Sequence, residues 1–214
     1  MRGLRKSLKS FNVHKDWTLF LDRDVVINKK IEGDYVRNWS QFEFIEEVVI
    51  EGLRILRQIF GRIIIVTNQR GIGRGFMTEE DLKNIHDNMV RILKENEIII
   101  DGIYYCPHDY EKEICNCRKP KLGLAYKAKT DFPEIDFQKS FIVGDTISDM
   151  EFGKRVGMIT VLIVSNSDIE IHKGLVDFSF ESLLQLGIQL KDDNGRISCH
   201  GIFRLYKAKD NRQE

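Results

Sequence analysis

The feature that most constrains the fold is a short apolar run that ends in two carboxylates one residue apart, Thr18-Leu19-Phe20-Leu21-Asp22-Arg23-Asp24. An apolar run of this length is typical of a buried strand in a parallel sheet. Ligands bind beyond the carboxyl ends of strands in open α/β sheets, so the sequence predicts Asp22 and Asp24 at the mouth of a site. Residues i and i+2 of an extended backbone point the same way, so these carboxylates need a divalent cation or a shared proton between them. A lone Asp-x-Asp is also compatible with an ordinary polar turn.

Apolar runs and amphipathic segments alternate along the chain. We expect strands over 18–21, 63–66, 98–105, 141–143 and 159–164, helices over 46–60, 78–95, 122–129 and 148–156, and a flexible connection over 71–75. This alternation predicts a doubly wound, Rossmann-like α/β domain with a parallel sheet. We place that domain at residues 17–184, between a basic extension at 1–16 and a polar extension at 185–214.

The composition is that of a globular protein without an excess of one charge. The 214 residues, 42% of them hydrophobic, are enough for one domain with a sizeable core. The 33 basic and 33 acidic residues cancel, so we expect neither a nucleic-acid nor a membrane partner. No apolar run approaches the roughly 20 residues that span a bilayer. The basic start lacks the apolar segment of a secretory signal, and we therefore expect a cytoplasmic protein, acting as a monomer.

Polar residues follow three of the expected strands and share one chemical theme. Asp22 and Asp24 follow the first strand, Thr67-Asn68 the second, and Gly144-Asp145 a later one, with Asp149 four residues on. The segment Arg118-Lys119-Pro120 lies between the last two. These strand ends share one edge of a parallel sheet. There they offer acids for a metal ion, a hydroxyl and an amide for phosphate oxygens, and a fixed cation.

This set suits phosphoryl transfer through an aspartyl intermediate. Asp22 would attack phosphorus as the nucleophile, and Asp24 would protonate the leaving oxygen and later activate water. Mg²⁺ would bridge Asp22, Asp145 and the phosphate. The polar groups of residues 67–68 would bind the transferring group, and Lys119 would neutralise its charge. Taken singly, each residue also has a structural role open to it, such as a solvated surface charge for Lys119.

Three of the four cysteines lie within twelve residues, which in a cytoplasmic protein favours metal binding over disulfides. The pattern Cys106-x-His108 followed by Cys115-x-Cys117 supplies three thiolates and one imidazole. That is a complete tetrahedral set for structural Zn²⁺ with no open position. The loop is otherwise polar, so zinc would fix it; reduced cysteines packed in a core are the alternative. Zinc here would also position Arg118 and Lys119, which follow directly.

In this order, the Asp-Arg-Asp, Thr-Asn, Lys119 and Gly-Asp motifs resemble those of the haloacid-dehalogenase-like phosphatases. Longer segments are similar to those of the D-glycero-D-manno-heptose 1,7-bisphosphate 7-phosphatases: residues 20–28, 33–36, 66–75, 106–108 and 115–120. The histidinol-phosphate phosphatases share nearly the same set. The resemblance covers roughly residues 17–180.

The resemblance implies a Mg-dependent phosphatase that removes the 7-phosphate of a heptose bisphosphate, a small-molecule sugar phosphate used for bacterial surface glycans. It implies Mg²⁺ held by Asp22, Asp145 and the backbone carbonyl of Asp24. It also implies that Arg118 and the segment Thr67-Asn68-Gln69-Arg70 hold the sugar phosphate. No large cap domain is expected, because short loops that include the zinc-binding loop 106–117 cover the site.

One residue departs from the family pattern. Val25 stands where the family has glycine directly after the second aspartate. If that position requires a positive φ, valine costs about 1–3 kcal/mol in strain and shifts Asp24. Val25 therefore leaves open a catalytically weakened zinc-containing binding protein. The shared motifs leave open a second alternative to the heptose phosphatase, a histidinol-phosphate phosphatase.

Overall fold

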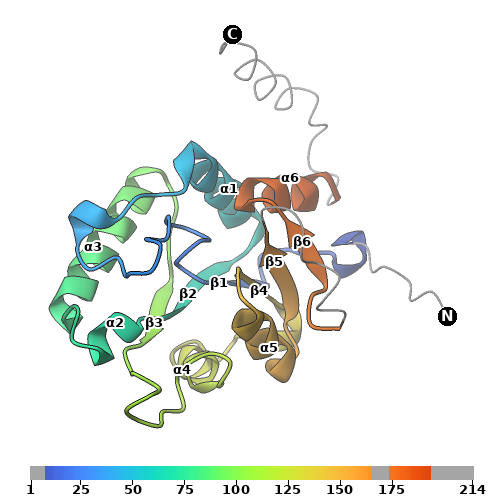
Figure 1. Ribbon diagram of the computed structural model, residues 1–214. Helices are drawn as coiled ribbons and strands as arrows, with labels where there is room; N and C mark the ends of the chain where they lie inside the picture. Colours follow the sequence, from blue (N-terminus) through green and yellow to red (C-terminus); the bar gives the residue numbers. More distant parts are fainter. Residues whose placement is uncertain (1–7, 165–173, 194–214) are drawn as a thin grey trace.

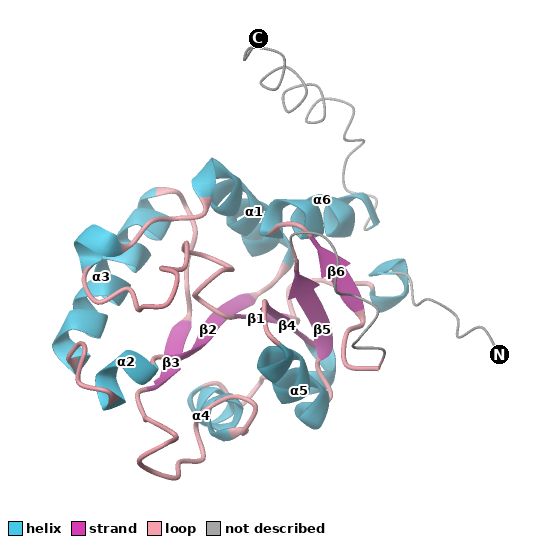
Figure 2. Ribbon diagram, in the orientation of Figure 1, coloured by secondary structure: helices cyan, strands magenta, loops and turns pink. Residues whose placement is uncertain are grey.

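The computed structural model describes residues 8–164 and 174–193. Within them, six parallel strands form one sheet with helices on both faces (Figures 1 and 2). The strands are β1 (Thr18–Leu21), β2 (Arg62–Asn68), β3 (Gly102–Cys106), β4 (Ser140–Gly144), β5 (Ile159–Ile163) and β6 (Phe178–Phe180). Their order is β3-β2-β1-β4-β5-β6. The chain therefore runs outward from β1 to β3 and returns to the other side with β4, which confirms the doubly wound fold.

The helices cover the sheet in two layers. They are α1 (Glu46–Ile59), α2 (Arg70–Gly73), α3 (Glu79–Glu95), α4 (Gly123–Asp131), α5 (Ile147–Val156) and α6 (Leu183–Asp193). Successive side chains of a strand point to opposite faces. Leu19 and Leu21 of β1 accordingly join the core under α1, α3 and α6, whereas Phe20 joins the core under α4 and α5. No second domain interrupts the described residues.

Helix α3 begins where the sequence predicts a helix start. The Thr78 hydroxyl accepts a hydrogen bond from the backbone N–H of Asp81, at 3.1 Å. The Asp81 carboxylate accepts one in return from the backbone N–H of Thr78, at 2.8 Å. This reciprocal cap satisfies two donors that have no partner inside the helix. The apolar positions that follow at helical spacing, Leu82, Ile85, Met89 and Leu93, are buried.

Two local predictions were wrong. The strand expected over 98–105 begins only at Gly102, where it pairs with Ile64 of β2. The segment 71–75, expected as a flexible connection, contains most of the short helix α2. That helix is held by the cysteine loop (residues 106–117), because Gly73 donates from its backbone N–H to the carbonyl of Pro107 at 2.8 Å.

Both predicted terminal extensions include residues that pack on the domain. The short 3₁₀ helix η1 (Leu8–Phe11) and the residues after it pack on the domain, with Leu8 and Val13 buried. The polar extension predicted from residue 185 is wrong for 185–193, because this stretch lies in α6 and buries Leu186 and Leu190. Polar residues lie among its apolar ones, so the composition of this stretch did not predict a helix. The rest of the predicted extensions, 1–7 and 194–214, lies outside the described residues.

The contact between α1 and α6 leads to a stability prediction. A Cβ added to Gly52 of α1 would lie 2.5 Å from the backbone nitrogen of Leu184 in α6. Overpacking of this kind costs about 1–3 kcal/mol, which exceeds the roughly 1 kcal/mol that alanine gains in a helix. We expect Gly52→Ala to lower the free energy of unfolding in urea by up to about 2 kcal/mol. Gly187→Ala is the matched control, because its Cβ would meet the side chain of Ile55 at 3.1 Å and no backbone atom closer than the carbonyl oxygen of Gly52 at 3.4 Å; equal losses in both variants would contradict the prediction.

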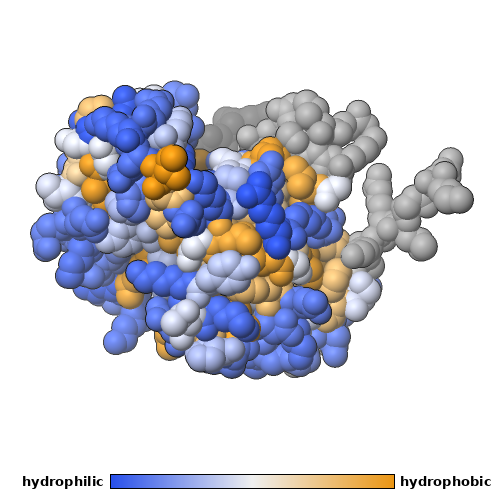
Figure 3. Space-filling view, turned by 90° about the horizontal axis from the view of Figure 1, so that it is seen from below, coloured by the Kyte–Doolittle hydropathy of each residue, from blue (hydrophilic) through white to orange (hydrophobic). Residues whose placement is uncertain are grey.

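The surface seen from the side of α4 and α5 is mixed (Figure 3). Hydrophilic residues dominate its periphery, and the hydrophobic residues form separate patches. The exposed large hydrophobic residues of the described chain are Phe76, Ile99, Tyr110, Ile114 and Tyr126. None of the described helices is long and apolar enough to cross a membrane.

Candidate active site

A cleft of about 300 Å³ opens at the carboxyl edge of the sheet, beside β1 and β4. This is where the strand order reverses and where open α/β sheets bind ligands. The predicted site residues that line it are Asp22, Asp24, Asn68, Gln69, Arg118, Lys119 and Asp145. Segments far apart in the sequence thus form one site, as predicted from the shared edge of the parallel strands. Thr67 and Arg70 are not among the lining residues.

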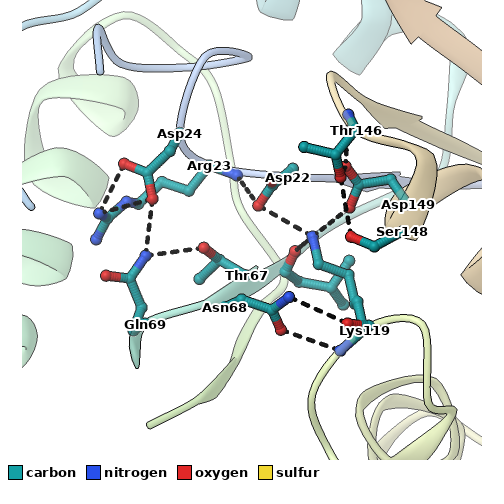
Figure 4. Close-up of polar contacts among 11 residues, drawn as sticks. Asp22, Arg23, Asp24, Thr67, Asn68, Gln69, Lys119, Thr146, Ser148 and Asp149 are labelled. Atoms are coloured by element: carbon teal, nitrogen blue, oxygen red, sulfur yellow. Dashed lines mark hydrogen bonds and ion pairs between the residues drawn. The ribbon is translucent and has the colours of Figure 1, made fainter. Parts of the chain in front are cut away.

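Lys119 lies at the centre of the site, with its side chain 1% exposed (Figure 4). Its Nζ is 3.0 Å from Oδ1 of Asp22 and 2.6 Å from Oδ1 of Asp149. It also donates to the carbonyl of Val66, at 2.7 Å. Burial by itself would lower the pKa of Lys119, but the carboxylates of Asp149 and Asp22 outweigh it and raise that pKa. Lys119 is therefore a fixed buried cation, and the alternative of a solvated surface charge is wrong.

Asn68, at the end of β2, holds the backbone of Lys119. Its side-chain oxygen accepts a hydrogen bond from the Lys119 backbone N–H at 3.0 Å, and its amide donates to the Lys119 carbonyl at 3.3 Å. Both backbone hydrogen-bonding groups of Lys119 are thereby fixed by a single side chain (Figure 4). Asn68 thus has a positioning role that is separate from its predicted contact with phosphate.

Three carboxylates crowd beside Lys119. Oxygens of Asp22, Asp145 and Asp149 lie within 4.8 Å of one another. Burial raises the pKa of Asp22 to about 7, which Lys119 opposes and the nearby carboxylates reinforce. Burial, and then the charge of Asp149, raises the pKa of Asp145 to about 6. Such crowding is relieved by a divalent cation, so these oxygen donors fit Mg²⁺.

Asp149 is the anchored member of this group. One of its oxygens accepts from the backbone N–H of Thr146 at 3.1 Å and from the Thr146 hydroxyl at 2.6 Å. The other faces Lys119. This pairing caps α5 at its first turn. Because Asp149 is engaged on both oxygens, Asp22 and Asp145 are the carboxylates best placed to hold a cation.

Asp24 has a cation of its own. Nη2 of Arg23 lies 2.8 Å and 3.0 Å from its two carboxylate oxygens. Asn28 and Gln69 each donate to it from a side-chain amide at 2.9 Å. Burial would raise the pKa of Asp24, but the charge and hydrogen bonds of Arg23, with the two amides, lower it.

The pair of carboxylates therefore differs from the sequence expectation. A cation or proton shared between Asp22 and Asp24 was predicted from an extended backbone. Instead β1 ends at Leu21, and the two side chains face different partners (Figure 4). Asp22 pairs with Lys119 and Asp24 with Arg23. The turn after the strand thus separates two groups that would repel each other if they faced one way.

Val25 occupies the left-handed region, with φ of 65°. A β-branched residue is strained there, and glycine is not. We expect Val25→Gly to raise kcat, because the turn that carries Asp24 relaxes, and to stabilise the fold by about 1 kcal/mol after the extra chain entropy of glycine. Val25→Ala is the matched control: it removes the branch but keeps the Cβ, so its gain should be smaller. Side-by-side kcat values with no gain for glycine would contradict the prediction.

The two predicted residues outside the cleft lining have other contacts. Thr67 is fully buried, and its hydroxyl accepts from the side-chain amide of Gln69 at 2.8 Å. Arg70 pairs with Asp109, Nε to Oδ1 at 2.6 Å, and with Glu111, Nη2 to Oε2 at 2.7 Å. Its charge is thus balanced by the cysteine loop.

Two guanidinium groups lie over the ring of Tyr110 in the cysteine loop. The central carbon of Arg70 is 4.0 Å from the centre of the Tyr110 ring, and that of Arg118 is 4.7 Å from it. Cations over an aromatic face are attracted by its electrons. Within the described residues Arg118 has no acidic partner, and its Nη1 is buried without a hydrogen bond. Arg118 is therefore the cation of this pair that is available to an anionic substrate.

The cysteine loop brings its four predicted ligands together. Its three Sγ atoms and Nδ1 of His108 lie within 4.8 Å of one another. Sγ of Cys106 is 3.6 Å from Sγ of Cys115 and 3.5 Å from Nδ1 of His108, which is 3.0 Å from Sγ of Cys117. Zn–S bonds of about 2.3 Å in a tetrahedron place sulfur ligands about 3.8 Å apart. The donor set therefore fits a structural zinc ion.

Sequence reasoning assigned no role to several residues of the site. Lys30, Asp34 and Tyr35 line the cleft from the loop after β1. The only signal for them was the motif at 33–36, noted as a family resemblance. Arg23 was noted only as the middle of Asp-Arg-Asp, and its partner in space could not be read from the chain.

Comparison of the sequence with known proteins finds a matching family model and named phosphatase relatives. The family model for polynucleotide kinase 3 phosphatase matches residues 17–181. A D-glycero-alpha-D-manno-heptose-1,7-bisphosphate 7-phosphatase of Mycobacterium tuberculosis is 37% identical over 183 residues, which cover 84% of this chain and 94% of the relative. A D-glycero-beta-D-manno-heptose-1,7-bisphosphate 7-phosphatase of Haemophilus influenzae is 36% identical over 180 residues, 81% of this chain and 96% of the relative.

A solved structure shares the fold. The D,D-heptose 1,7-bisphosphate phosphatase of B. bronchiseptica, complexed with magnesium and phosphate, superposes with a TM-score of 0.74. The two chains are 23% identical, and the match covers 83% of this chain and 99% of the other. The arrangement of strands and helices described above is thus common to both.

Proposed function

Because the chain belongs to the haloacid-dehalogenase-like heptose-bisphosphate phosphatase family and is a phosphoric monoester hydrolase, we propose that it removes the 7-phosphate of D-glycero-D-manno-heptose 1,7-bisphosphate through a phosphoryl group carried on Asp22. The observation that carries the proposal is the pairing of buried Asp22 with buried Lys119 at the reversal of strand order. A fixed cation beside a nucleophilic carboxylate suits attack on an anionic phosphorus.

The proposed reaction has two displacements. In the first, an oxygen of Asp22 bonds to phosphorus while the bond from phosphorus to the sugar oxygen breaks, and Asp24 gives that oxygen its proton. In the second, Asp24 takes a proton from water, the water oxygen bonds to phosphorus, and Asp22 is released with free phosphate. The lowered pKa of Asp24 suits the second step. The negative charge of the bound phosphate favours the protonated form that the first step needs.

Two metal ions belong to the proposal. Mg²⁺ held by Asp22, Asp145 and the backbone carbonyl of Asp24 would supply positive charge for the phosphate oxygens. Support comes from the crowded carboxylates of the cleft. Structural Zn²⁺ would be held by Cys106, His108, Cys115 and Cys117, the cluster that precedes Arg118 and Lys119 in the chain.

The test is phosphate release in the presence of Mg²⁺ from the α and β anomers of the heptose bisphosphate and from histidinol phosphate. We expect a kcat/KM preference of at least about 100-fold for one heptose bisphosphate. Relatives named for either anomer match about equally well, so the assay also decides the anomer. A preference for histidinol phosphate would replace the proposed substrate. Release from none of the three would favour a weakened enzyme or a different phosphate ester.

A single substitution tests whether Arg118 binds the substrate. Hydrogen bonds to charged groups contribute about 1.5–3 kcal/mol, so losing one from the substrate should raise KM by about tenfold or more. We expect a rise in KM of this size for Arg118→Gln with the heptose bisphosphate. The rise should be smaller with the heptose 7-monophosphate, which lacks the second anionic group. Lys127→Gln is the control, since Lys127 is an exposed cation of α4 outside the cleft lining. An equal rise in KM for both substrates would contradict the role given to Arg118.

A further inference from the structure

The proposed reaction leaves one buried histidine without a role. His86 lies on α3 and is 7% exposed. It does not line the cleft. Its Nε2 is 3.3 Å from Nη1 of Arg23, and its ring meets the ring of Tyr105 edge-on with 6.0 Å between the centres. A polar ring buried beside a charged group needs a defined hydrogen-bonding state.

Arg23 connects His86 to the carboxylate of Asp24. The Arg23 side chain is 1% exposed, and its Nη2 contacts both carboxylate oxygens of Asp24. Its Nε is buried without a hydrogen-bond partner. The guanidinium is therefore held by one nitrogen at His86 and by another at Asp24. If residue 86 offered no acceptor, both Nη1 and Nε of Arg23 would be buried without a hydrogen-bond partner. A rotated guanidinium that donates from Nε to Asp24 would then be favoured, because fewer of its nitrogens would lack a partner.

His86 has to be the acceptor in its contact with Arg23. A guanidinium only donates hydrogen bonds, so Nε2 of His86 carries no proton and its Nδ1 does. Burial, and then the charge of Arg23, lowers the pKa of His86 to about 3. The neutral ring is therefore the stable form near neutral pH.

We propose that His86 is a positioning residue: by accepting a hydrogen bond from Arg23 it fixes the edge of the guanidinium that Arg23 presents to Asp24. The consequence is a fixed orientation of the Asp24 carboxylate. The inference rests on the proposed function, in which Asp24 acts as acid and base. His86 itself touches neither substrate nor metal.

The first test compares two replacements of His86 in the full chain. His86→Leu keeps the bulk but removes the acceptor, whereas the amide oxygen of Gln in His86→Gln can still accept from Arg23. We expect the leucine variant to lose about tenfold in kcat with KM changed less than about twofold, and the glutamine variant to keep most of kcat. His14→Leu is the matched control on an exposed histidine paired with Asp16. Equal losses in the leucine and glutamine variants would overturn the proposal.

A double-mutant cycle then asks whether His86 acts through Asp24. In an Asp24→Asn background we expect His86→Leu to change the remaining rate by less than about twofold, because the carboxylate it positions is already gone. A full further loss in that background would overturn the proposal. The cycle is run with the heptose bisphosphate and with p-nitrophenyl phosphate. Activity on the aryl ester alone would refute the proposed substrate while leaving the test of His86 intact.

A third measurement does not depend on any variant folding. The imidazole nitrogen chemical shifts of the labelled, folded protein report which ring nitrogen carries the proton. We expect an unprotonated Nε2 and a protonated Nδ1 for His86 at neutral pH. A protonated Nε2 would overturn the proposal, since that nitrogen could not accept from Arg23.

Discussion

Replacing Asp22 by asparagine should lower kcat by about 10⁴-fold or more, the range seen when a nucleophile is removed from an enzyme that forms a covalent intermediate. The amide is nearly the same size but is a poor nucleophile. The loss should appear in kcat with every substrate, because the change removes bond formation rather than recognition. Rapid-quench mass spectrometry should find a phosphate adduct on the wild-type chain and none on Asp22→Asn.

Two checks make this prediction specific. Asp16→Asn is the control, because Asp16 is an exposed acid of the same type that pairs with Lys139; its kcat should stay within about twofold of wild type, as for most surface substitutions. Thermal unfolding of Asp22→Asn should remain cooperative, which shows that the loss is chemical. Retention of a tenth or more of wild-type kcat would contradict a nucleophilic Asp22.

Removing one thiolate of the cysteine cluster should have the second-largest effect. Cys117→Ser should lose bound zinc and lower the melting temperature by about 10 °C, because losing a structural metal costs several kcal/mol and each kcal/mol shifts a domain of this size by about 2–4 °C. The kcat/KM should fall as well, since Arg118 and Lys119 follow the cluster directly and Lys119 reaches Asp22. Limited proteolysis should cut the variant within residues 106–117.

The control for this variant is Cys199→Ser, which replaces the one cysteine of the sequence that is not among the predicted zinc ligands; its zinc content and melting temperature should match the wild type. Metal analysis of the purified wild-type chain should give one zinc per chain. A wild-type chain that is fully active and contains no zinc would rule out the structural role assigned to the metal, whatever the stability of the variant.

Local patterns were enough to predict most elements and seven of the residues that line the cleft. The apolar run before Asp22 forms β1. The apolar residues at helical spacing form the buried face of α3, namely Leu82, Ile85, Met89 and Leu93. The spacing of the cysteines and His108 predicted a cluster that the structure does form. These predictions succeeded because each depends on residues close in sequence, whose shared face or loop follows from backbone geometry alone.

Local patterns failed where a segment depends on distant partners. Helix α6 was missed because its few leucines are stabilised by α1, where Gly52 lets the two backbones approach. Arg70 was assigned to the substrate by its motif, but it pairs with Asp109 and Glu111 of the cysteine loop. In both cases the deciding neighbour lies dozens of residues away.

The sequence by itself determined which chemical groups this protein carries and that parallel strand ends would gather them at one edge. Only the tertiary structure decided how these groups pair: Lys119 with Asp22 and Asp149, and His86 with Arg23. The physical reason is that strand order and helix packing determine which side chains become neighbours, and both depend on the whole core. Burial then makes each pairing strong, because an unpaired buried charge or donor is costly.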